Sequence, residues 1–323
     1  TGSNGKTTTK ELIKAVLAEK YQTFATKGNL NNHIGVPLSL LSIQSDVEIA
    51  VIEMGANHQK EIEFLCEIAQ PTHGLITNIG LAHLDGFGGF EGVKKGTAFI
   101  YRNNPYLMEM SQVADLNKVI YYGTEKEDTI SGKLKHSDPL IEFEWATTEG
   151  EYEAKANLTG TYNFENILAA ICIGHFFELT ANQINTGLAN YYPNNNRSQL
   201  TKTENNTVIC DFYNANPSSM AAALNNLKAL NATQKTAIIG DMFELGEEAP
   251  EQHEEIVKLA TSYALETLFI GSNFYAFKHK YPGNYFSTPI EAAQYLKENQ
   301  LKGQLVLLKG SRGMALEQLL PLL

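Results

Sequence analysis

The sequence predicts an α/β protein of two domains, the first with a mainly parallel sheet plus an antiparallel meander, and the second Rossmann-like. Three observations support this. The chain has 323 residues, which is enough for about two domains. A glycine-rich turn leads into a helical pattern at its start, and strands alternate with helices over its last third.

Composition restricts the class of protein. Hydrophobic residues make up 43% and charged residues 19%, as in globular chains. The net charge of −11 is opposite to that of a typical nucleic-acid or anionic-membrane binder, so we expect neither nucleic-acid binding nor membrane insertion. The longest apolar stretch, 167–177, is too short to cross a bilayer. Three scattered cysteines without a CxxC pair fit a reducing compartment, and we expect a cytoplasmic monomer.

The first nine residues, TGSNGKTTT, have the composition of a phosphate-binding loop. Gly2 and Gly5 permit a tight turn whose N–H groups, with the dipole of the following helix, would hold phosphate. Lys6 would reach the β- and γ-phosphates and Thr7 would ligate Mg²⁺. An ordinary glycine turn before a helix is the simpler alternative. Because a buried strand normally precedes such a loop, we expect further residues upstream of Thr1.

The elements of the first domain follow in order. Helical spacing runs over 10–20, and apolar strands are predicted at 48–52 and 74–77. Glu53 follows the first strand, where a Mg²⁺-handling carboxylate would lie, although a solvated loop acid explains it equally well. His83 follows the second strand, and a satisfied loop or core histidine is its alternative. The remaining elements are the meander strands 119–122, 141–145 and 152–158, a strand over 96–100, and helices over 163–177 and 181–191.

The second domain is predicted to alternate regularly. Its strands are expected at 208–210, 236–239, 267–270 and 305–308, and its helices at 217–230, 250–263, 289–299 and 314–320. The polar stretch 192–199 is the best linker candidate, so the predicted domains are 1–197 and 198–323. Polar clusters at 211–216, 240–242 and 309–313 follow strands, and such ends form the binding crevice of an open α/β sheet.

Eight strings in this order resemble the Mur ligase family. The first four are TGSNGKTTTK (1–10), GNLNNHIGVPL (28–38), EMGANH (53–58) and TNIGLAH (77–83). The last four are GTYNFENILAA (160–170), DFYNANPSSM (211–220), GDMFELG (240–246) and LKGSRG (308–313). The resemblance covers nearly the whole chain apart from the meander. YNANP and GDMFELG are similar to the strings of the family member that adds a dipeptide.

The resemblance implies an ATP-dependent ligase of peptidoglycan precursor synthesis that forms a C–N bond. It would join D-alanyl-D-alanine to UDP-N-acetylmuramoyl-tripeptide through an acyl phosphate, releasing ADP and phosphate, with ATP and Mg²⁺ required. Since carboxylate oxygen is a poor leaving group, such activation is chemically necessary, and Mg²⁺ and Lys6 would screen the meeting anions. Three alternatives stay open: another Mur-type or folylpolyglutamate-type ligase, a catalytically inactive ATP-binding module, and a P-loop kinase or GTPase.

The resemblance also implies roles for individual residues. The ATP-holding loop would consist of Gly2, Ser3, Asn4, Gly5, Lys6, Thr7 and Thr8. Asn163 and Asn166 would lie beside the adenine and Asp211 at the ribose. Arg197 would reach the nucleotide phosphates when the domains close. The expected metal ligands are Thr7, Glu53 and His83, and the expected catalytic residues are Lys6, Glu53, His83 and Arg197.

Two further groups are assigned to the substrates. Asn29, Asn31 and Asn32 would line the side that faces the muramyl substrate. Lys309, Ser311 and Arg312 would hold the dipeptide carboxylate, a group that suits the forked donors of arginine.

The chain departs from the family pattern at two places. The family's N-terminal UDP-gripping domain is absent from the sequence, as is the strand before the phosphate loop. The family also has a lysine, modified to a carbamate that helps to hold Mg²⁺, soon after the AH motif. An ungapped alignment places Thr97 there and Phe99 where an acid is expected. We therefore expect a missing segment between Lys95 and Gly96, and transfer no carbamate role to Lys94 or Lys95; a true deletion would leave ATP binding alone.

Overall fold

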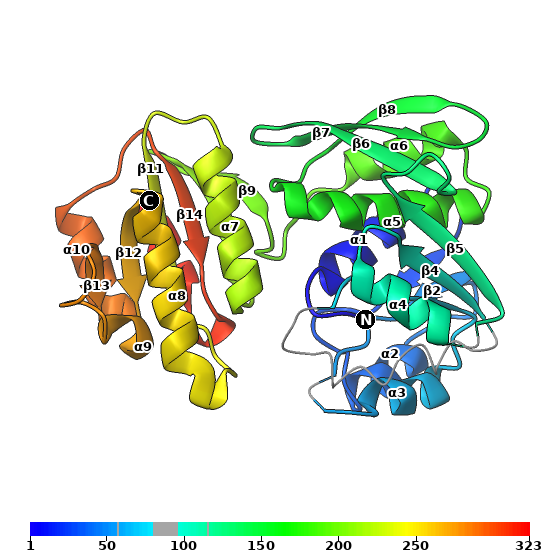
Figure 1. The fold of residues 1–323 in the computed structure, drawn as a ribbon, viewed down its shortest axis with the longest axis horizontal. Helices are drawn as coiled ribbons and strands as arrows, with labels where there is room; N and C mark the ends of the chain where they lie inside the picture. Colours follow the sequence, from blue (N-terminus) through cyan, green and yellow to red (C-terminus); the bar gives the residue numbers. More distant parts are fainter. Residues whose placement is uncertain (57, 80–95, 115) are drawn as a thin grey trace. The chain divides into compact units, whose positions relative to one another are not determined.

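The computed structural model describes residues 1–56, 58–79, 96–114 and 116–323, in two compact units (Figure 1). The first unit contains 1–136, 141–157 and 162–191, and the second contains 137–140, 158–161 and 192–323. The predicted domain boundary after Arg197 stays a prediction. Gln199, placed in the predicted linker, instead begins strand β9 (Gln199–Lys202). In the described part of the chain, no helix is long and apolar enough to span a membrane.

The first unit begins with the phosphate-loop helix α1 (Lys6–Leu17). The helix starts earlier than the predicted position 10 because Gly5, with a φ of 78°, turns the chain directly into it. The parallel pair β1 (Thr23–Ala25) and β2 (Ile49–Val51) follows, with α2 (Gly35–Leu41) between the two strands and α3 (Glu61–Ala69) after them.

A mixed sheet forms the rest of this unit, with strands in the order β3-β4-β5-β6-β7-β8. The strands are β3 (His73–Leu75), β4 (Thr97–Tyr101), β5 (Lys118–Gly123), β6 (Ile130–Ser137), β7 (Ile141–Ala146) and β8 (Glu151–Ala156), with α4 (Pro105–Val113) between β4 and β5. β3, β4 and β5 are parallel, and β7 and β8 are antiparallel. The meander prediction was wrong for the strand at 119–122, because β5 pairs in parallel with both β4 and β6. Strand β6 itself was not predicted. Asp128 folds the loop between β5 and β6 back by accepting hydrogen bonds from Arg102 and from the Glu125 N–H.

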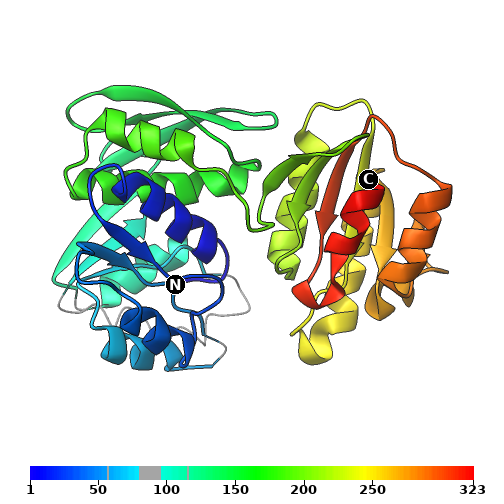
Figure 2. The same ribbon diagram turned by 180° about the vertical axis from the view of Figure 1, so that it is seen from behind.

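Helices α5 (Phe164–Phe176) and α6 (Ala181–Asn190) pack against α1, beside which they lie in Figure 2. The approach of α6 is close enough that a Cβ atom on Gly187 would lie 2.6 Å from the Cα of Val16. The helix carrying the phosphate loop is therefore fixed by direct backbone packing.

An apolar groove of about 490 Å³ lies between β2 and β3. It is lined by Ile49, Val51 and Leu75 among others, with Ile13 and Leu17 of α1 also facing it. Within the described residues, β2 pairs only with β1 and β3 only with β4, so each strand has one edge without a pairing neighbour.

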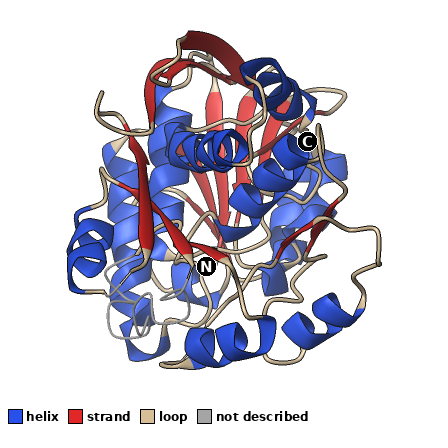
Figure 3. Ribbon diagram, turned by 90° about the vertical axis from the view of Figure 1, so that its right-hand side faces the viewer, coloured by secondary structure: helices blue, strands red, loops and turns tan. Residues whose placement is uncertain are grey.

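The second unit has a sheet in the order β13-β12-β11-β14-β10-β9, parallel except for β9. Its other strands are β10 (Thr207–Asp211), β11 (Lys235–Gly240), β12 (Glu266–Ile270), β13 (Asn284–Phe286) and β14 (Leu305–Lys309). Its helices are α7 (Pro217–Ala229), α8 (Ala249–Ser262), α9 (Ser272–Tyr275) and α10 (Pro289–Glu298). Figure 3 shows the mixture of helices and strands that the predicted α/β class requires, and the fold class is confirmed.

The predicted helix at 314–320 differs from the structure. The chain forms 3₁₀ turns there, Arg312–Met314 and Leu316–Leu322. Ala315 between them has a φ of 50°, and Pro321 lacks the N–H that an α-helix would use.

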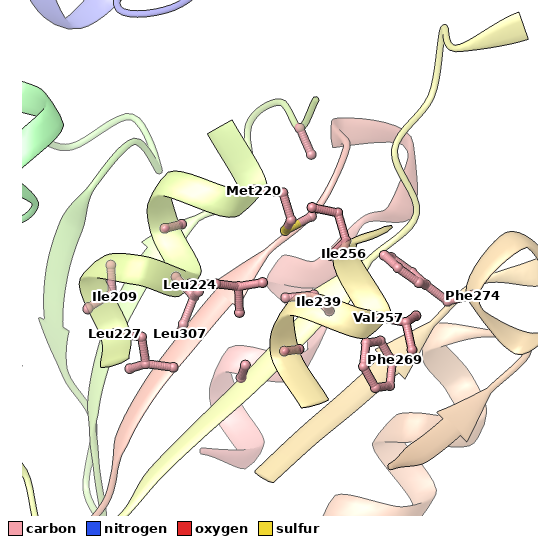
Figure 4. Close-up of a cluster of buried hydrophobic side chains, with 14 of the residues drawn as sticks. Ile209, Met220, Leu224, Leu227, Ile239, Ile256, Val257, Phe269, Phe274 and Leu307 are labelled. Atoms are coloured by element: carbon pink, nitrogen blue, oxygen red, sulfur yellow. The ribbon is translucent and has the colours of Figure 1, made fainter. Parts of the chain in front are cut away.

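The core of this unit lies on both faces of the sheet. Ile239 and Leu307 point toward α7 and α8 (Figure 4), whereas the neighbouring Ile238 and Leu308 point toward the opposite cluster, which includes Leu296 of α10. Because adjacent strand residues face opposite sides, both faces of the central strands are apolar and covered. The polar residues that could bind ligands are therefore confined to the strand ends.

Candidate functional site

Two glycines of the phosphate loop adopt backbone conformations that side chains rarely tolerate. Gly2 and Gly5 have φ values of 144° and 78°. A Cβ atom would lie 2.1 Å from the Thr77 hydroxyl oxygen at Gly2 and 2.5 Å from the Asn166 amide oxygen at Gly5. The loop therefore requires glycine at both positions for conformation and for space.

The segment after β3 holds this loop in place. Ser3 N–H donates to the Asn78 carbonyl oxygen at 2.9 Å, and Asn4 N–H donates to the Asn78 side-chain oxygen at 2.9 Å. The Asn78 amide in turn donates to Glu165 at 2.9 Å. Burial raises the pKa of Glu165, while the hydrogen bond from Asn78 opposes that shift. Sequence reasoning assigned no role to Asn78 or Glu165, although both lie within family-like strings.

Lys6 and the start of α1 complete a site for anions. The Lys6 ammonium lies over the loop and donates to the Gly2 carbonyl oxygen at 2.6 Å. Thr7 and Thr8 are buried in the first turn, and the free N–H groups of a helix start favour an anion there.

Glu53 is a buried carboxylate beside the start of α1, with 5% of its surface exposed. Its Oε1 accepts hydrogen bonds from the Thr7 hydroxyl at 3.2 Å and the Asn31 amide at 2.9 Å. Its Oε2 is buried without a hydrogen-bond partner among the described residues, 3.7 Å from the Lys10 ammonium. A carboxylate with an unused oxygen beside a threonine hydroxyl fits Mg²⁺, which prefers oxygen ligands. The third expected ligand, His83, lies outside the described residues, as do Lys94 and Lys95.

Lys10 is a charged residue at the end of the first family-like string, and no role was predicted for it. It is 3% exposed, donates to the Thr26 carbonyl oxygen at 2.6 Å, and pairs with Glu11 at 2.8 Å. Its proximity to Glu53 balances the charge of that carboxylate. The strand predicted at 96–100 is present as β4, so Thr97 and Phe99 are buried strand residues.

The two asparagines expected beside the adenine lie against the phosphate-loop helix. The Asn166 side-chain oxygen accepts a hydrogen bond from the Thr9 hydroxyl at 2.9 Å, and its amide donates to Asn163 at 3.0 Å. Both are buried, and Asn166 packs beneath Gly5. The structure thus ties this pair to the loop, while the adenine contact stays a prediction.

The asparagines expected at the muramyl substrate have different surroundings. The Asn31 side-chain amide donates its hydrogen bond to the Glu53 carboxylate. Asn32 accepts hydrogen bonds from the N–H groups of Ile34 and Gly35, at 3.1 and 2.9 Å, at the start of α2. Asn29 is exposed in the same loop. Their substrate role stays a prediction.

In the second unit, Asp211 and Lys309 form an ion pair at the ends of β10 and β14. The Lys309 ammonium lies 2.7 Å from Asp211 Oδ2 and 3.3 Å from the Asn214 carbonyl oxygen, and it is 2% exposed. Ser198 N–H donates to the other Asp211 oxygen at 3.2 Å. Because Lys309 is already neutralised, Arg312 is the better candidate for a ligand carboxylate.

Arg197 and Arg312 both lie against the ring of Tyr213, a residue to which sequence reasoning gave no role. Their guanidinium carbons are 4.1 and 5.0 Å from the ring centroid. The only sequence signal for Tyr213 was its position in the YNANP string. The structure therefore brings together two predicted site residues that are far apart in the sequence.

Hydrogen bonds of Ser311 join the loop after β11 to the loop after β14. Ser311 N–H donates to the Asp241 carbonyl oxygen at 3.2 Å, and Phe243 N–H donates to the Ser311 hydroxyl oxygen at 2.9 Å. Met242 N–H donates to Nε2 of His253, a fully buried histidine. Burial lowers the pKa of His253, which is consistent with a neutral ring that accepts this hydrogen bond.

Comparison with known families identifies two domain matches. Residues 1–174 match the Mur ligase middle domain, and residues 196–312 match the domain described as Mur ligase, glutamate ligase domain. Together these matches include the phosphate loop, Glu53 and the Asp211 ion pair.

Named relatives match over nearly the whole chain. UDP-N-acetylmuramoyl-tripeptide--D-alanyl-D-alanine ligase of Bacillus subtilis (strain 168) is 33% identical over 345 residues, covering 99% of this chain and 74% of that protein. The protein of the same name from Escherichia coli (strain K12) is 33% identical over 337 residues, covering 98% and 74%. Both alignments are longer than this chain of 323 residues, so each relative has residues that this chain lacks.

Solved structures of MurF also match this chain over nearly its whole length. A crystal structure of MurF from Acinetobacter baumannii has a TM-score of 0.86 at 29% identity, covering 98% of this chain and 74% of that one. MurF ligase from Thermotoga maritima in complex with ADP has a TM-score of 0.85 at 27% identity, covering 99% and 77%.

Proposed function

This chain belongs to the Mur ligase family, and we propose that it is the ligase that joins D-alanyl-D-alanine to UDP-N-acetylmuramoyl-tripeptide, with cleavage of ATP to ADP and phosphate. The observation that carries this proposal is the glycine-requiring loop at Gly2 and Gly5 beside the buried carboxylate of Glu53. The dipeptide as second substrate is supported by the full-chain similarity to relatives named for that reaction.

We assign ATP binding to the domain 1–197 and dipeptide binding to the domain 198–323. Residues 2–8 would surround the phosphates, with Lys6 and the N–H groups of α1 neutralising them. Asn163 and Asn166 would support the base, and Asp211 the ribose. Thr7 and Glu53 would hold Mg²⁺, whose chemistry when bound is to neutralise phosphate charge.

The reaction would proceed in two steps. A carboxylate oxygen of the acceptor attacks the γ-phosphorus, the bond to the β-phosphate oxygen breaks, and ADP leaves. The dipeptide nitrogen then attacks the acyl carbon, the acyl C–O bond breaks, and phosphate leaves with that electron pair while the nitrogen loses a proton. The first step brings two anions together, so Lys6 and Arg197 would stabilise charge on the transferred group. Ser311 and Arg312 would hold the dipeptide carboxylate, and Lys309 would act by positioning Asp211.

The experiment is a measurement of ADP and phosphate release by the purified chain with ATP, MgCl₂, UDP-N-acetylmuramoyl-tripeptide and D-alanyl-D-alanine. We expect release only when all components are present, and none from Lys6→Ala. Release with glutamate but not with D-alanyl-D-alanine would contradict the dipeptide assignment. ATP binding without release of ADP would overturn the ligase proposal in favour of an ATP-binding module.

A further inference from the structure

One aromatic ring in the second unit contacts two guanidinium groups. Cζ of Arg197 lies 4.1 Å from the centroid of the Tyr213 ring, and Cζ of Arg312 lies 5.0 Å from it. Arg197 precedes β9, Tyr213 follows β10 and Arg312 follows β14. Three separate segments therefore meet at this ring.

Neither arginine is neutralised within the described residues. No carboxylate in that part of the chain forms an ion pair with Arg197 or Arg312, and Asp211, at the same strand end as Tyr213, is paired with Lys309 at 2.7 Å. Nε of Arg197 is buried without a hydrogen-bond partner there. Two like charges close together repel each other, and the electron-rich face of the ring offsets only part of that cost. Such an arrangement favours an anion.

We propose that Tyr213 is a positioning residue that holds Arg197 and Arg312 together for anionic groups of the substrates. A contact with the face of a ring consumes none of the N–H donors of a guanidinium group, so these donors stay available for phosphate or carboxylate oxygens. Arg197 serves the transferred phosphate and Arg312 the dipeptide carboxylate. The identity of these two anions rests on the proposed function. The contact of both arginines with one ring is observed independently of that function.

Steady-state kinetics of ring variants test this role. Tyr213→Leu removes the ring, and we expect the KM values for ATP and for D-alanyl-D-alanine to rise about 3- to 30-fold each, from the usual strength of a cation–π contact. The KM for the UDP-linked acceptor should stay within about twofold, because neither arginine serves it. Tyr213→Phe keeps the ring and should restore both KM values. Tyr263→Leu is the matched control. Nζ of Lys228 lies 3.9 Å from the centroid of the Tyr263 ring, elsewhere in the unit, so this variant loses a similar contact and should leave all KM values unchanged.

A binding measurement separates this proposal from the proposed function. Calorimetric titration with D-alanyl-D-alanine needs no turnover, and the Kd should rise about 3- to 30-fold in Tyr213→Leu but not in Tyr213→Phe. Arg312→Lys keeps the charge without the planar group and should raise the Kd similarly if Tyr213→Leu does not fold. Ring-dependent binding without ligase turnover would refute the proposed function and support the role of Tyr213. An unchanged Kd in a folded Tyr213→Leu would overturn that role, as would an unchanged Kd in Arg312→Lys if Tyr213→Leu does not fold.

Discussion

The carboxylate of Glu53 joins helix α1 to the loop before α2. It accepts from Thr7 of α1 and from Asn31 of the loop before α2, and it faces the ammonium of Lys10. Its position after a predicted strand was visible in the sequence. Its pairing with Lys10 was not, because that contact joins positions far apart in the chain and depends on how α1 packs against β2.

Replacing Glu53 tests the metal assignment. Glu53→Gln keeps the shape of the side chain but removes the charge, and we expect the Mg²⁺ concentration for half-maximal ADP release to rise about 10- to 100-fold. Glu67→Gln, at an exposed position of α3, is the matched control and should leave the Mg²⁺ titration unchanged. An unchanged titration for Glu53→Gln would exclude Glu53 as a metal ligand.

Breaking the ion pair of Lys309 and Asp211 should destabilise the second unit, because it leaves a largely buried charge without a partner. Lys309→Met leaves the Asp211 carboxylate without its 2.7 Å partner, and we expect a loss of about 3 kcal/mol in the free energy of unfolding. The double variant Asp211→Asn with Lys309→Met should recover part of this loss. Urea unfolding measures both, and equal losses in the single and double variants would contradict the coupling.

His253 should make stability depend on pH. Burial lowers its pKa in the folded protein, so the unfolded chain binds the proton more readily. The contribution of His253 is therefore complete above its unfolded pKa of about 6.5 and is lost as pH falls from there through the folded pKa. The facing groups are Asp241, whose oxygen is 3.7 Å from Nε2, the Met242 N–H, the Ala249 carbonyl and the Phe274 ring.

The expected slope is at most about 1.4 kcal/mol per pH unit. His253→Gln should reduce the pH dependence of the unfolding free energy below pH 6.5, measured by urea unfolding at a series of pH values. The exposed His279→Gln should not change it. If both variants keep the full dependence, another group is responsible.

At the scale of elements, prediction succeeded where local signals were strong. α7 begins at Pro217 after an Asn216 cap that accepts a hydrogen bond from the Ser219 N–H at 2.8 Å, and the sequence showed both residues. α2 was missed because its seven residues make only about two turns, which is too short for a helical spacing of apolar residues to be recognised. Strands as short as β1 and β13 carry too few residues for an alternating pattern, and their pairing partners define them.

The packing of α6 on α1 predicts a destabilising effect for a substitution that normally favours helices. Gly187→Ala would place a methyl group 2.6 Å from the Cα of Val16 and 2.7 Å from the Ala15 carbonyl oxygen, both backbone atoms. We expect a net loss of about 1 to 3 kcal/mol, despite the better helix propensity of alanine. Asn182→Ala, at an exposed position of the same helix, should be neutral or stabilising in thermal unfolding. Stabilisation by Gly187→Ala would contradict this close packing.

At the scale of the whole molecule, the fold class was predictable because strand–helix alternation and the three polar clusters at strand ends are patterns of the sequence itself. The assembly of the site was less predictable. Arg197, Tyr213 and Arg312 come from three segments, and only folding places them at one ring. Likewise the sequence did not predict that Lys309 is buried, because it stands close to Ser311 and Arg312, which were expected to bind an anion.

Among the described residues, β2 and β3 each have one edge without a pairing neighbour at the groove between them, and this has a consequence for the behaviour of this chain in concentrated solution. An exposed strand edge is a template for intermolecular β-pairing, so this 323-residue chain should form dimers and larger aggregates as its concentration rises. Its net charge of −11 opposes such association through repulsion, and added salt should therefore promote it. Ala50→Lys, at an exposed position of β2, should suppress it. Light scattering across concentration and ionic strength would measure the effect, and a monomer under every condition would show that these edges are protected.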